Sequence, residues 1–471
     1  MQELNLAYKY GLLYWNCANL VVDSGSLDEE SNDSTNYGKM GTAIAKVQKE
    51  NVQITLPLIE SADFGFKPDR DNDRIIFGLK GINGINTELS QAIIENRPYK
   101  SIEDFAEKML ISKEETPAII KKSQMIQLIK AGCFTELHHE DRKKTMIWYL
   151  KNFVFNPCNS LTLSQLPQLV SLGMITDEIE SAYRMVNFKK YVLDQKFLIE
   201  KHIEPNKKIV KRGYHDGYYT LDSNSQSFFI EHFSEDSVIR LDKGYYVISE
   251  KKFIKEVDSY IQPLKDWMSL EETLNTYNEL LFNQLYEENA SGSISKWNMS
   301  ALTFYEKDSH ELQDVNEDLY GIVNYFNLPE EPEPYDYYTR YINGVAKSIP
   351  KYKISCIAGT VINADNNHHT VTLLTKYGPV ICKINKGHYS YYNKRISKVG
   401  EDGKKHAVED SWFKRGTLLR ICGIKREDMF FPLNYSDTIY THTINRINEV
   451  YEDGTLLLQS ERTKTGSFEE D

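Results

Sequence analysis

At 471 residues and 54.7 kDa, the chain is too long for a single hydrophobic core and predicts about two to four domains. Hydrophobic residues make up 41% and charged residues 26% of the chain, a composition that is typical of a soluble globular protein and excludes disorder along most of its length. A net charge of -12 would argue against a nucleic-acid partner if the charge were spread evenly.

The charge is not spread evenly. Residues 266–336 hold two Lys and Arg against sixteen Asp and Glu, whereas residues 337–434 hold seventeen Lys and Arg against seven Asp and Glu. The acidic span therefore exceeds the whole negative charge of the chain, and the span after it is strongly basic. A nucleic-acid surface in the basic span is compatible with this distribution.

Two features bear on location. The six cysteines are scattered without a Cys-x-x-Cys pair, which indicates neither a zinc knuckle nor a disulfide framework and fits a reducing cytoplasm. The apolar run at 7–22 is interrupted by Lys9, Asn16 and Asn19, so it predicts a buried helix rather than a signal peptide or a membrane span. We therefore expect a cytoplasmic protein without a membrane partner.

The first 141 residues combine helices with short strands. A polar loop at 23–35 separates two predicted helices, a strand follows at 52–59, and two short strands at 64–79 flank a turn rich in Asp and Asn. Four short helices come next, and capping-box patterns at Ser101–Asp104 and Ser112–Glu115 begin two of them. The predicted helices span 5–22, 38–49, 87–97, 101–110, 114–122 and 123–131.

The middle of the chain is mixed. Residues 142–204 and 251–327 are predicted to be mostly helical, while residues 208–250, which include the run QSFFIEHF, alternate with period two and predict a small antiparallel sheet. The run LPEEPEPYD at 328–336 is rich in Pro and acidic residues, which favours a linker. We expect a domain boundary there.

Five strand-like runs follow the linker, and a long connection at 386–416 separates the third run from the fourth. This order is the plan of an OB-fold, a partly open five-stranded barrel that binds oligonucleotides. The predicted fold class is therefore multidomain α+β, with an all-helical block, a mixed middle region and a C-terminal OB-fold barrel. The five runs span 352–363, 370–375, 379–385, 417–425 and 429–435.

Basic and aromatic side chains are interleaved in and after the long connection. A single-strand binder needs cations that follow the phosphates and flat rings on which bases stack. The alternative is a solvated basic helix whose tyrosines plug the end of the barrel. The predicted single-strand contacts are Lys383, Lys386, Tyr389, Tyr391, Tyr392, Lys394, Arg395, Lys414 and Arg415, with Lys398, Trp412 and Arg420 as an extension of the same surface.

The run PDRDND at 68–73 matches the carboxylate spacing with which polymerase palm domains hold two metal ions. A palm carboxylate lies on a strand of a large mixed sheet, and the 67 residues before Pro68 are too few to build one. Asp and Asn also favour tight turns, so we predict a hairpin turn here and no catalytic residue in the chain. The His pairs at 138–139 and 368–369 lack further ligands, and no metal site is predicted.

The segment after this turn has the pattern of a helix-hairpin-helix, whose Gly-hydrophobic-Gly turn lets backbone N–H groups and a helix N-terminus approach a DNA phosphate. Here the turn is Gly84-Ile85-Asn86, followed by an amphipathic helix. Asparagine tolerates the left-handed conformation that the second glycine would adopt, although its side chain hinders close approach. The predicted duplex contacts are Lys80, Gly84, Ile85, Asn86 and Thr87.

Residues 55–137 resemble the part of the bacterial DNA polymerase III alpha subunit, a C-family replicative polymerase, that joins the fingers to the tandem helix-hairpin-helix region. The resemblance rests on the runs ITLPLIESADFGFKPDRDNDRIIFGLKGINGI, YKSIEDFAEKM and LIKAGCFTEL. Residues 8–25 are similar to the last fingers helix, and ALTFYEKDSHEL at 301–312 is a degenerate match to a family segment before the OB domain.

The resemblance implies the C-terminal part of such a polymerase, either from a split gene in a phage or bacterium or as an expressed fragment. It would position primer-template duplex and single-stranded template, while a partner chain with the palm, thumb and fingers supplies catalysis and Mg²⁺, so it should not polymerise alone. The implied parts are a fingers-like region at 1–54, a β-hairpin with the tandem helix-hairpin-helix region at 55–141, a helical region with a small sheet at 142–327, the linker at 328–336, the OB-fold at 337–435 and a strand-like segment with a polar tail at 436–471.

The family also contacts the sliding clamp through a Gln-x-x-hydrophobic-hydrophobic peptide, and QKFLI at 195–199 has that form. The matching residues are Gln195, Leu198 and Ile199, although apolar residues in this run also suit the core face of a helix. Other replisome proteins would be further partners. The alternative function is a stand-alone single-stranded-DNA-binding or replisome adaptor protein, and a neighbouring gene for the missing palm would favour the polymerase.

Overall fold

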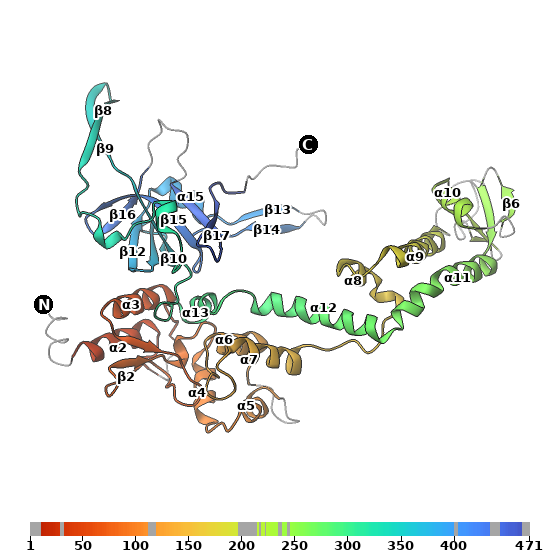
Figure 1. The fold of residues 1–471 in the computed structure, drawn as a ribbon, viewed down its shortest axis with the longest axis horizontal. Helices are drawn as coiled ribbons and strands as arrows, with labels where there is room; N and C mark the ends of the chain where they lie inside the picture. Colours follow the sequence, from red (N-terminus) through yellow and green to blue (C-terminus); the bar gives the residue numbers. More distant parts are fainter. Residues whose placement is uncertain are drawn as a thin grey trace, which may run out of the picture. The chain divides into compact units, whose positions relative to one another are not determined.

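A computed structural model describes residues 11–28, 33–111, 119–195, 214–215, 218–221, 223–233, 238–242, 245–399, 404–433 and 443–463 of the chain (Figure 1). The chain divides into two compact units, Met1–Tyr149 with Ala290–Asp471 and Leu150–Asn289. The domain boundaries drawn from the sequence stay predictions. Among the described helices, none is both long enough and apolar enough to cross a bilayer.

The described part of the first unit starts with two helices and a small sheet. The Asn36 side chain caps helix α3 by accepting a hydrogen bond from the Lys39 N–H, and the helix buries Met40, Ile44 and Val47. Strand β3 pairs parallel with β1 and antiparallel with β2. The elements are α2 (Leu12–Asp23), α3 (Tyr37–Lys49), β1 (Gln53–Thr55), β2 (Lys67–Asp69) and β3 (Arg74–Ile76).

The Asp-rich run between β2 and β3 is a hairpin turn, which confirms the prediction. The Asp69 carboxylate accepts hydrogen bonds from Arg74, 2.7 Å away, and from Asn72, 2.9 Å away, and these bonds lower the pKa of Asp69. Asp73 has a left-handed φ of 48°, which Asp tolerates better than most residues. Nowhere in the described parts of the chain do three potential metal ligands gather into a site.

A block of short helices follows, which confirms the helices predicted at 87–97, 101–110 and 123–131. Most of the helix predicted at 114–122, with the capping box at 112–115, lies outside the described residues, and residues 119–121 are not helical. Ser101 caps helix α5, since its hydroxyl accepts a hydrogen bond from the Asp104 N–H. The Phe105 ring packs edge-on against Tyr99 and Phe134, with ring centroids 4.8 and 4.9 Å apart. The elements are the 3-10 helix η1 (Leu79–Gly81), α4 (Thr87–Glu95), α5 (Ile102–Met109), α6 (Lys122–Lys130) and α7 (Arg142–Tyr149).

The second unit combines helices with a small sheet of order β4-β5-β7-β6. The run QSFFIEHF, predicted as a strand, lies in helix α10 instead, apart from its last residue, Phe233, which directly follows the helix. Phe229 and Phe233 are four residues apart and stack at 4.9 Å in the core, because side chains at this spacing share a helical face. The elements are η2 (Leu150–Val154), η3 (Leu163–Gln165), α8 (Leu166–Ser171), α9 (Asp177–Gln195), β4 (Tyr214–His215), β5 (Tyr218–Thr220), α10 (Ser223–His232), β6 (Val238–Asp242), β7 (Tyr245–Ser249), α11 (Glu250–Met268) and α12 (Glu271–Ala290).

A buried arginine joins the helical block to the segment that re-enters the first unit. The Arg142 guanidinium donates hydrogen bonds to the Lys130 carbonyl and to the Glu306 carboxylate, both at 2.9 Å. It also donates to the Asn298 side chain, and burial lowers the pKa of Arg142. The elements of this segment are α13 (Ile294–Leu302), α14 (Glu317–Tyr320) and the 3-10 helix η6 (Tyr325–Asn327).

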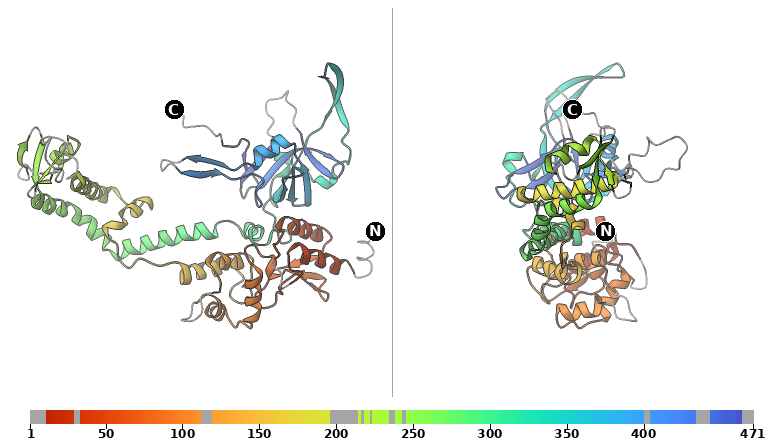
Figure 2. Two further views of the ribbon diagram at one scale, coloured as in Figure 1. Left: turned by 180° about the vertical axis from the view of Figure 1, so that it is seen from behind. Right: turned by 90° about the vertical axis from the view of Figure 1, so that its right-hand side faces the viewer.

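A two-stranded hairpin, β8 (Pro334–Ile342) and β9 (Val345–Tyr352), stands out from the barrel that follows it (Figure 1 and Figure 2). The predicted linker at 328–336 therefore ends inside a strand. The ladder is regular from Asp336 opposite Lys351 to the tip of the hairpin. The Pro and acidic residues of the linker mostly precede this ladder, which explains why the linker pattern hid the start of the strand.

Five strands form a closed barrel consistent with an OB-fold, in the order β10-β11-β12-β16-β15, and β15 pairs back to β10. Strand β12 runs parallel to β16, whereas the other pairs are antiparallel. These are the five runs predicted from the sequence. The strands are β10 (Ser355–Asp365), β11 (Thr370–Thr375), β12 (Gly378–Lys383), β15 (Leu418–Arg426) and β16 (Met429–Pro432).

The long connection between β12 and β15 carries a helix and a second hairpin, and two further strands extend the sheet from β15. Tyr389 and Tyr392 from this helix pack into the barrel core with Trp412 and Phe413. The connection therefore supplies part of the core. The added elements are α15 (Lys386–Asn393), β13 (Ile396–Val399), β14 (Lys405–Glu409), β17 (Ile444–Val450) and β18 (Leu456–Gln459).

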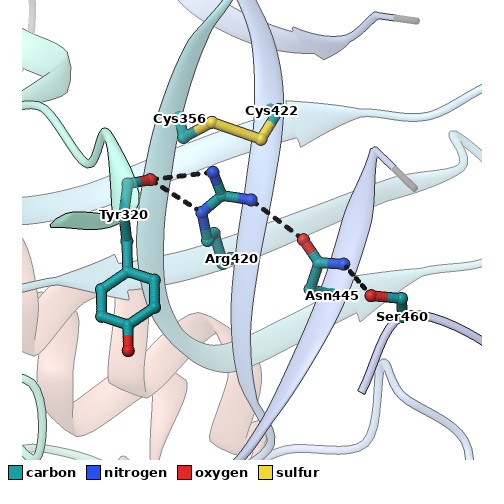
Figure 3. The surroundings of a disulfide bond; sticks show 6 residues. All are labelled: Tyr320, Cys356, Arg420, Cys422, Asn445 and Ser460. Carbon is teal, nitrogen blue, oxygen red and sulfur yellow. Dashed lines mark hydrogen bonds between the residues drawn. A yellow bond between two sulfur atoms is a disulfide. The ribbon is translucent and has the colours of Figure 1, made fainter. Parts of the chain in front are cut away.

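A disulfide joins Cys356 on β10 to Cys422 on β15 (Figure 3). The two residues are directly opposite in the ladder, with Cα atoms 4.1 Å apart. The Cys422 N–H donates to the Thr443 carbonyl, and the Cys356 carbonyl accepts from the Val323 N–H. The two cysteines therefore form a non-hydrogen-bonded pair of the antiparallel ladder, the kind of pair in which the side chains lie closer together. The scattered spacing of the cysteines indicated no disulfide framework and missed this bond, because strand register, and not spacing in the sequence, brings the two thiols together.

Candidate nucleic-acid interface

The predicted hairpin turn has the backbone that close approach to a phosphate requires. Gly84 has a φ of +81°, and among the described residues no atom lies within 4 Å of where its Cβ would be. Asn86 is extended, with a φ of -93°, and its side chain caps α4 by accepting a hydrogen bond from the Leu89 N–H. The left-handed residue is therefore Gly84, and Asn86 acts as a helix cap, which corrects the expected role of the asparagine.

Two of the five predicted duplex contacts, Gly84 and Asn86, are exposed, whereas Lys80, Ile85 and Thr87 are buried. Lys80 is 6% exposed, and burial lowers the pKa of its ammonium. Its backbone N–H donates to the Phe64 carbonyl and anchors η1. Lys80 is therefore a buried residue beneath the turn, and its ammonium is not on the exposed surface that a duplex would contact.

Tyr37 connects this turn to the barrel. The Gly84 N–H donates to the Tyr37 hydroxyl at 3.3 Å, and that hydroxyl donates to the Ile82 carbonyl at 3.4 Å. The Arg415 guanidinium lies over the Tyr37 ring, 4.6 Å from its centroid. Gly84 and Arg415, predicted as parts of two separate surfaces, therefore contact the same side chain, Gly84 at its hydroxyl and Arg415 at the face of its ring.

A hollow of about 330 Å³ lies beside this contact. Its walls come from the start of α3, from β10 and from the loop before β15, so helical and barrel segments both contribute to it. Lys414 and Arg415 supply two cations to its lining. The lining residues are Gly38, Ile362, Asn363, Ala364, Lys414 and Arg415.

The three tyrosines predicted to stack on bases have different environments. Tyr391 is 52% exposed, whereas Tyr389 and Tyr392 are 3% and 8% exposed. The pKa of Tyr392 is raised to about 12 by burial, and its ring packs on Trp412 with centroids 5.1 Å apart. Tyr389 and Tyr392 therefore fit the alternative hypothesis, in which tyrosines fill the end of the barrel. Tyr391 is exposed and remains available for stacking on a base.

The predicted cations form an exposed group at the ends of α15 and beside it. Lys386, Lys394, Arg395 and Lys414 are exposed. Lys414 and Arg395 share the Asp410 carboxylate, at 2.7 and 3.4 Å, and the hydrogen bond from Lys414 is the main cause that lowers the pKa of Asp410. Lys383 is half-buried, and its ammonium donates to the His368 carbonyl.

Two residues proposed as extensions of this surface have internal roles. Trp412 is fully buried and donates to the Glu409 carboxylate. The Arg420 guanidinium donates to the Tyr320 carbonyl at 2.8 and 2.9 Å and to Asn445 at 3.0 Å (Figure 3). Burial also lowers the pKa of Arg420. Trp412 and Arg420 therefore stabilise the barrel. Of the three residues predicted to extend the single-strand surface, Lys398 is exposed and stays a predicted contact.

The predicted clamp peptide is described only at its start. Gln195 is the last residue of α9, and Leu198 and Ile199 lie outside the described residues. The clamp contact stays a prediction.

The histidine pairs make local bonds, since His368 lies 2.7 Å from Asp365 and His138 lies 2.9 Å from the Thr145 hydroxyl. The hydrogen bond from His368 is the main cause that lowers the pKa of Asp365 to about 2.

The residue that sequence reasoning missed is Tyr37. Its position directly after the Asn36 cap predicts the first turn of a helix, and nothing in the local pattern indicates what its ring contacts. Both of its partners lie far along the chain. Only the tertiary fold brings Tyr37 to Gly84 and Arg415, so the sequence alone did not predict these contacts.

Comparisons with known proteins agree with this geometry. Residues 51–145 match a family model described as a helix-hairpin-helix motif. Two curated relatives, "Probable DNA polymerase YorL" of Bacillus subtilis (strain 168) and "DNA-directed DNA polymerase" of Bacillus phage SPbeta, are each 40% identical over 98% of this chain. The chain spans 34%, about a third, of the length of each relative. Along almost its whole length, the chain is therefore homologous to part of a DNA polymerase.

Proposed function

We propose that the chain is the DNA-positioning part of a replicative polymerase of the C family, corresponding to the C-terminal portion of an alpha subunit. The helix-hairpin-helix turn holds the backbone of the primer-template duplex, and the barrel holds the single-stranded template. A palm domain outside this sequence catalyses nucleotide transfer. This function would place the chain in the cytoplasm with the replisome, in contact with a sliding clamp.

The observation that carries the proposal is the contact of Tyr37 with both Gly84 and Arg415. A primer-template changes from duplex to single strand at one point, so a protein that grips both sides needs its two surfaces close together. The turn offers a phosphate an exposed glycine at the start of α4, where the helix dipole favours negative charge. Lys414 and Arg415 lie on the barrel side of the same junction.

The proposal assigns the catalytic metals to the palm domain. The aspartates at 69–73 serve the β2–β3 turn, and Asp69 is held by Arg74 and Asn72. Across the described stretches of the chain, His, Cys, Asp and Glu side chains form no group of three that suits a metal. Mg²⁺, when bound by the palm, would supply the phosphoryl-transfer chemistry.

Single-strand binding should depend on cations and on one exposed ring. Tyr391 offers a stacking surface worth about 1 to 3 kcal/mol per base. Lys386 and Lys394 flank it at the ends of α15. Arg395 and Lys414 share Asp410, so a phosphate must compete with this carboxylate for them. Binding should therefore weaken steeply as salt rises.

Fluorescence anisotropy of the full chain on a labelled primer-template tests the proposal. The logarithm of the association constant should fall linearly with the logarithm of salt concentration. Changing Lys394 and Arg395 together to Ala should reduce the slope by about 1.4 on single strands, since each phosphate contact contributes about 0.7. Failure to bind any DNA at low salt would reject the proposal, and binding to single strands alone would favour an adaptor instead.

A further inference from the structure

The β8–β9 hairpin exposes almost all of its side chains. Every residue of β8 is exposed, as are the first four residues of β9. The tip is tightly turned, with a φ of 52° at Asn343 and 77° at Gly344, which matches the short turns that join twisted antiparallel strands. In Figure 2 the hairpin projects from the barrel in both views. It contributes little to a core, so its exposed composition calls for another explanation.

One face of the hairpin presents open aromatic rings. Tyr337 and Tyr341 are 58% and 74% exposed, and they lie on the same face because side chains alternate along a strand. Their cross-strand neighbours are Pro350 and Ala346, with Ser348 between them, so small side chains leave the rings uncovered. Four residues along a strand place the two rings about 13 Å apart.

The other face presents cations. Arg340 lies directly opposite Lys347, and Tyr338 lies beneath the Lys351 ammonium, 5.8 Å from its ring centroid. Residues 337–353 contain four Lys and Arg, namely Arg340, Lys347, Lys351 and Lys353, and neither Asp nor Glu. This ribbon leads directly into β10, the first strand of the barrel.

We propose that the β8–β9 hairpin is an additional contact for single-stranded DNA. Tyr337 and Tyr341 stack on bases, and Arg340 and Lys347 meet phosphates. Lys351 pairs with Asp336 at 3.7 Å, so the proposal uses the exposed cations Arg340 and Lys347. Flat exposed rings combined with exposed cations are the two ingredients that single-strand binders need, whereas a protein partner would favour an apolar centre. The inference rests on the proposed function, because it extends the path of the template beyond the barrel surface at α15.

The ring prediction is tested with paired substitutions at the same two positions. Y337T/Y341T removes both rings but keeps residues that favour strands, and Y337F/Y341F keeps the rings without their hydroxyls. Affinity is measured by anisotropy on an oligothymidine longer than about 16 nucleotides, the upper site size of one OB-fold. The Thr variant should bind at least about tenfold more weakly, and the Phe variant should bind like the unaltered chain.

The charge prediction is tested with R340A/K347A. Its matched control, K190A/K255A, removes two exposed lysines from α9 and α11 in the second unit and changes the net charge equally. The hairpin variant should lower the salt slope on single strands by about 1.4, and the control should leave it unchanged. Far-ultraviolet circular dichroism and thermal unfolding show that each variant is folded.

The outcomes separate this inference from the proposed function. If the unaltered chain binds DNA and the hairpin variants match their controls, the hairpin contact is rejected while the proposed function stands. If the unaltered chain binds no DNA, both are rejected. Equal losses for the Thr and Phe variants would overturn stacking, and a loss confined to blunt duplex would overturn the assignment to single strands.

Discussion

The guanidinium of Arg415 covers the ring of Tyr37, 4.6 Å from its centroid, and burial lowers the pKa of Arg415. The hydroxyl of the same Tyr37 side chain accepts a hydrogen bond from the Gly84 N–H. A barrel loop and a helix-hairpin-helix turn are thus held against one side chain from a third segment. This contact places the two predicted DNA-binding surfaces next to each other.

Gly84 should be required for duplex binding and not for single-strand binding. Replacing Gly84 by Leu forces a side chain into a left-handed backbone, which costs about 1 to 2 kcal/mol, and places it where a phosphate would approach. Gly173 is a matched control, because its φ is +69° and the described residues likewise leave space around its Cβ. Both variants should lose similar stability in urea unfolding, but only G84L should lose affinity for blunt duplex. Equal duplex affinity for G84L and G173L would remove the turn from the interface.

Arg142 should stabilise the first unit much more than a surface arginine stabilises its helix. Its side chain is 6% exposed and bonds Glu306, whereas Arg184 is 65% exposed and pairs with Glu180 on α9. Removing the buried charge leaves several acceptors unsatisfied, so R142M should lower the free energy of unfolding by about 3 kcal/mol or more. R184M should lower it by about 0.5 kcal/mol or less. Similar losses for the two variants, measured by denaturant unfolding, would mean that Arg142 is not the anchor described.

The Cys356–Cys422 bond should stabilise the barrel. It closes a loop with a sequence separation of 66 residues, which in the chain-entropy account corresponds to about 4 kcal/mol. Adding a reductant should therefore lower the unfolding midpoint of the unaltered chain. The C356A/C422A variant should be less stable and unaffected by reductant. If the reductant lowered the unfolding midpoint equally in both proteins, the effect would come from the other cysteines and not from the Cys356–Cys422 bond.

His310 should make stability depend on pH. Its Nε2–H donates to the Leu374 carbonyl and its Nδ1 accepts from the Leu312 N–H, so the buried ring is neutral. Burial lowers the pKa of His310 to about 4, below the unfolded value of about 6.5. The unfolded chain therefore gains a proton first as the pH falls, and this group costs about 2 kcal/mol of stability between about pH 7 and pH 5. H310Q should lack that part of the pH dependence; an identical pH profile for both proteins would contradict it.

Local patterns were sufficient for much of the fold. Each barrel strand carries its own apolar run between turn residues, and the hairpin turn at 68–73 and the Ser101 cap are determined by neighbours in the sequence. The run with Phe229 and Phe233 was wrongly predicted as a strand, because a short apolar run is compatible with both a strand and a helix. In the structure the two rings pack in the core from one helical face.

The site was predicted less completely, for a physical reason. Lysines and tyrosines at 383–398 indicate a basic aromatic surface, but which ring enters the barrel depends on how α15 is rotated, and this rotation buries Tyr389 and Tyr392 while exposing Tyr391. The Cys356–Cys422 pair and the Tyr37 contacts arise from strand register and tertiary packing. Long-range pairings of this kind leave no trace in local spacing.

The most direct test of a single interface compares three DNA ligands at one salt concentration. Affinity of the full chain is measured for a primer-template junction, for a blunt duplex and for a single strand of the same total length. If the turn and the barrel surface lie together as described, the junction should bind at least about tenfold more tightly than either uniform ligand, because both contacts form at once. A junction that binds no better than the stronger of the two uniform ligands would contradict the account.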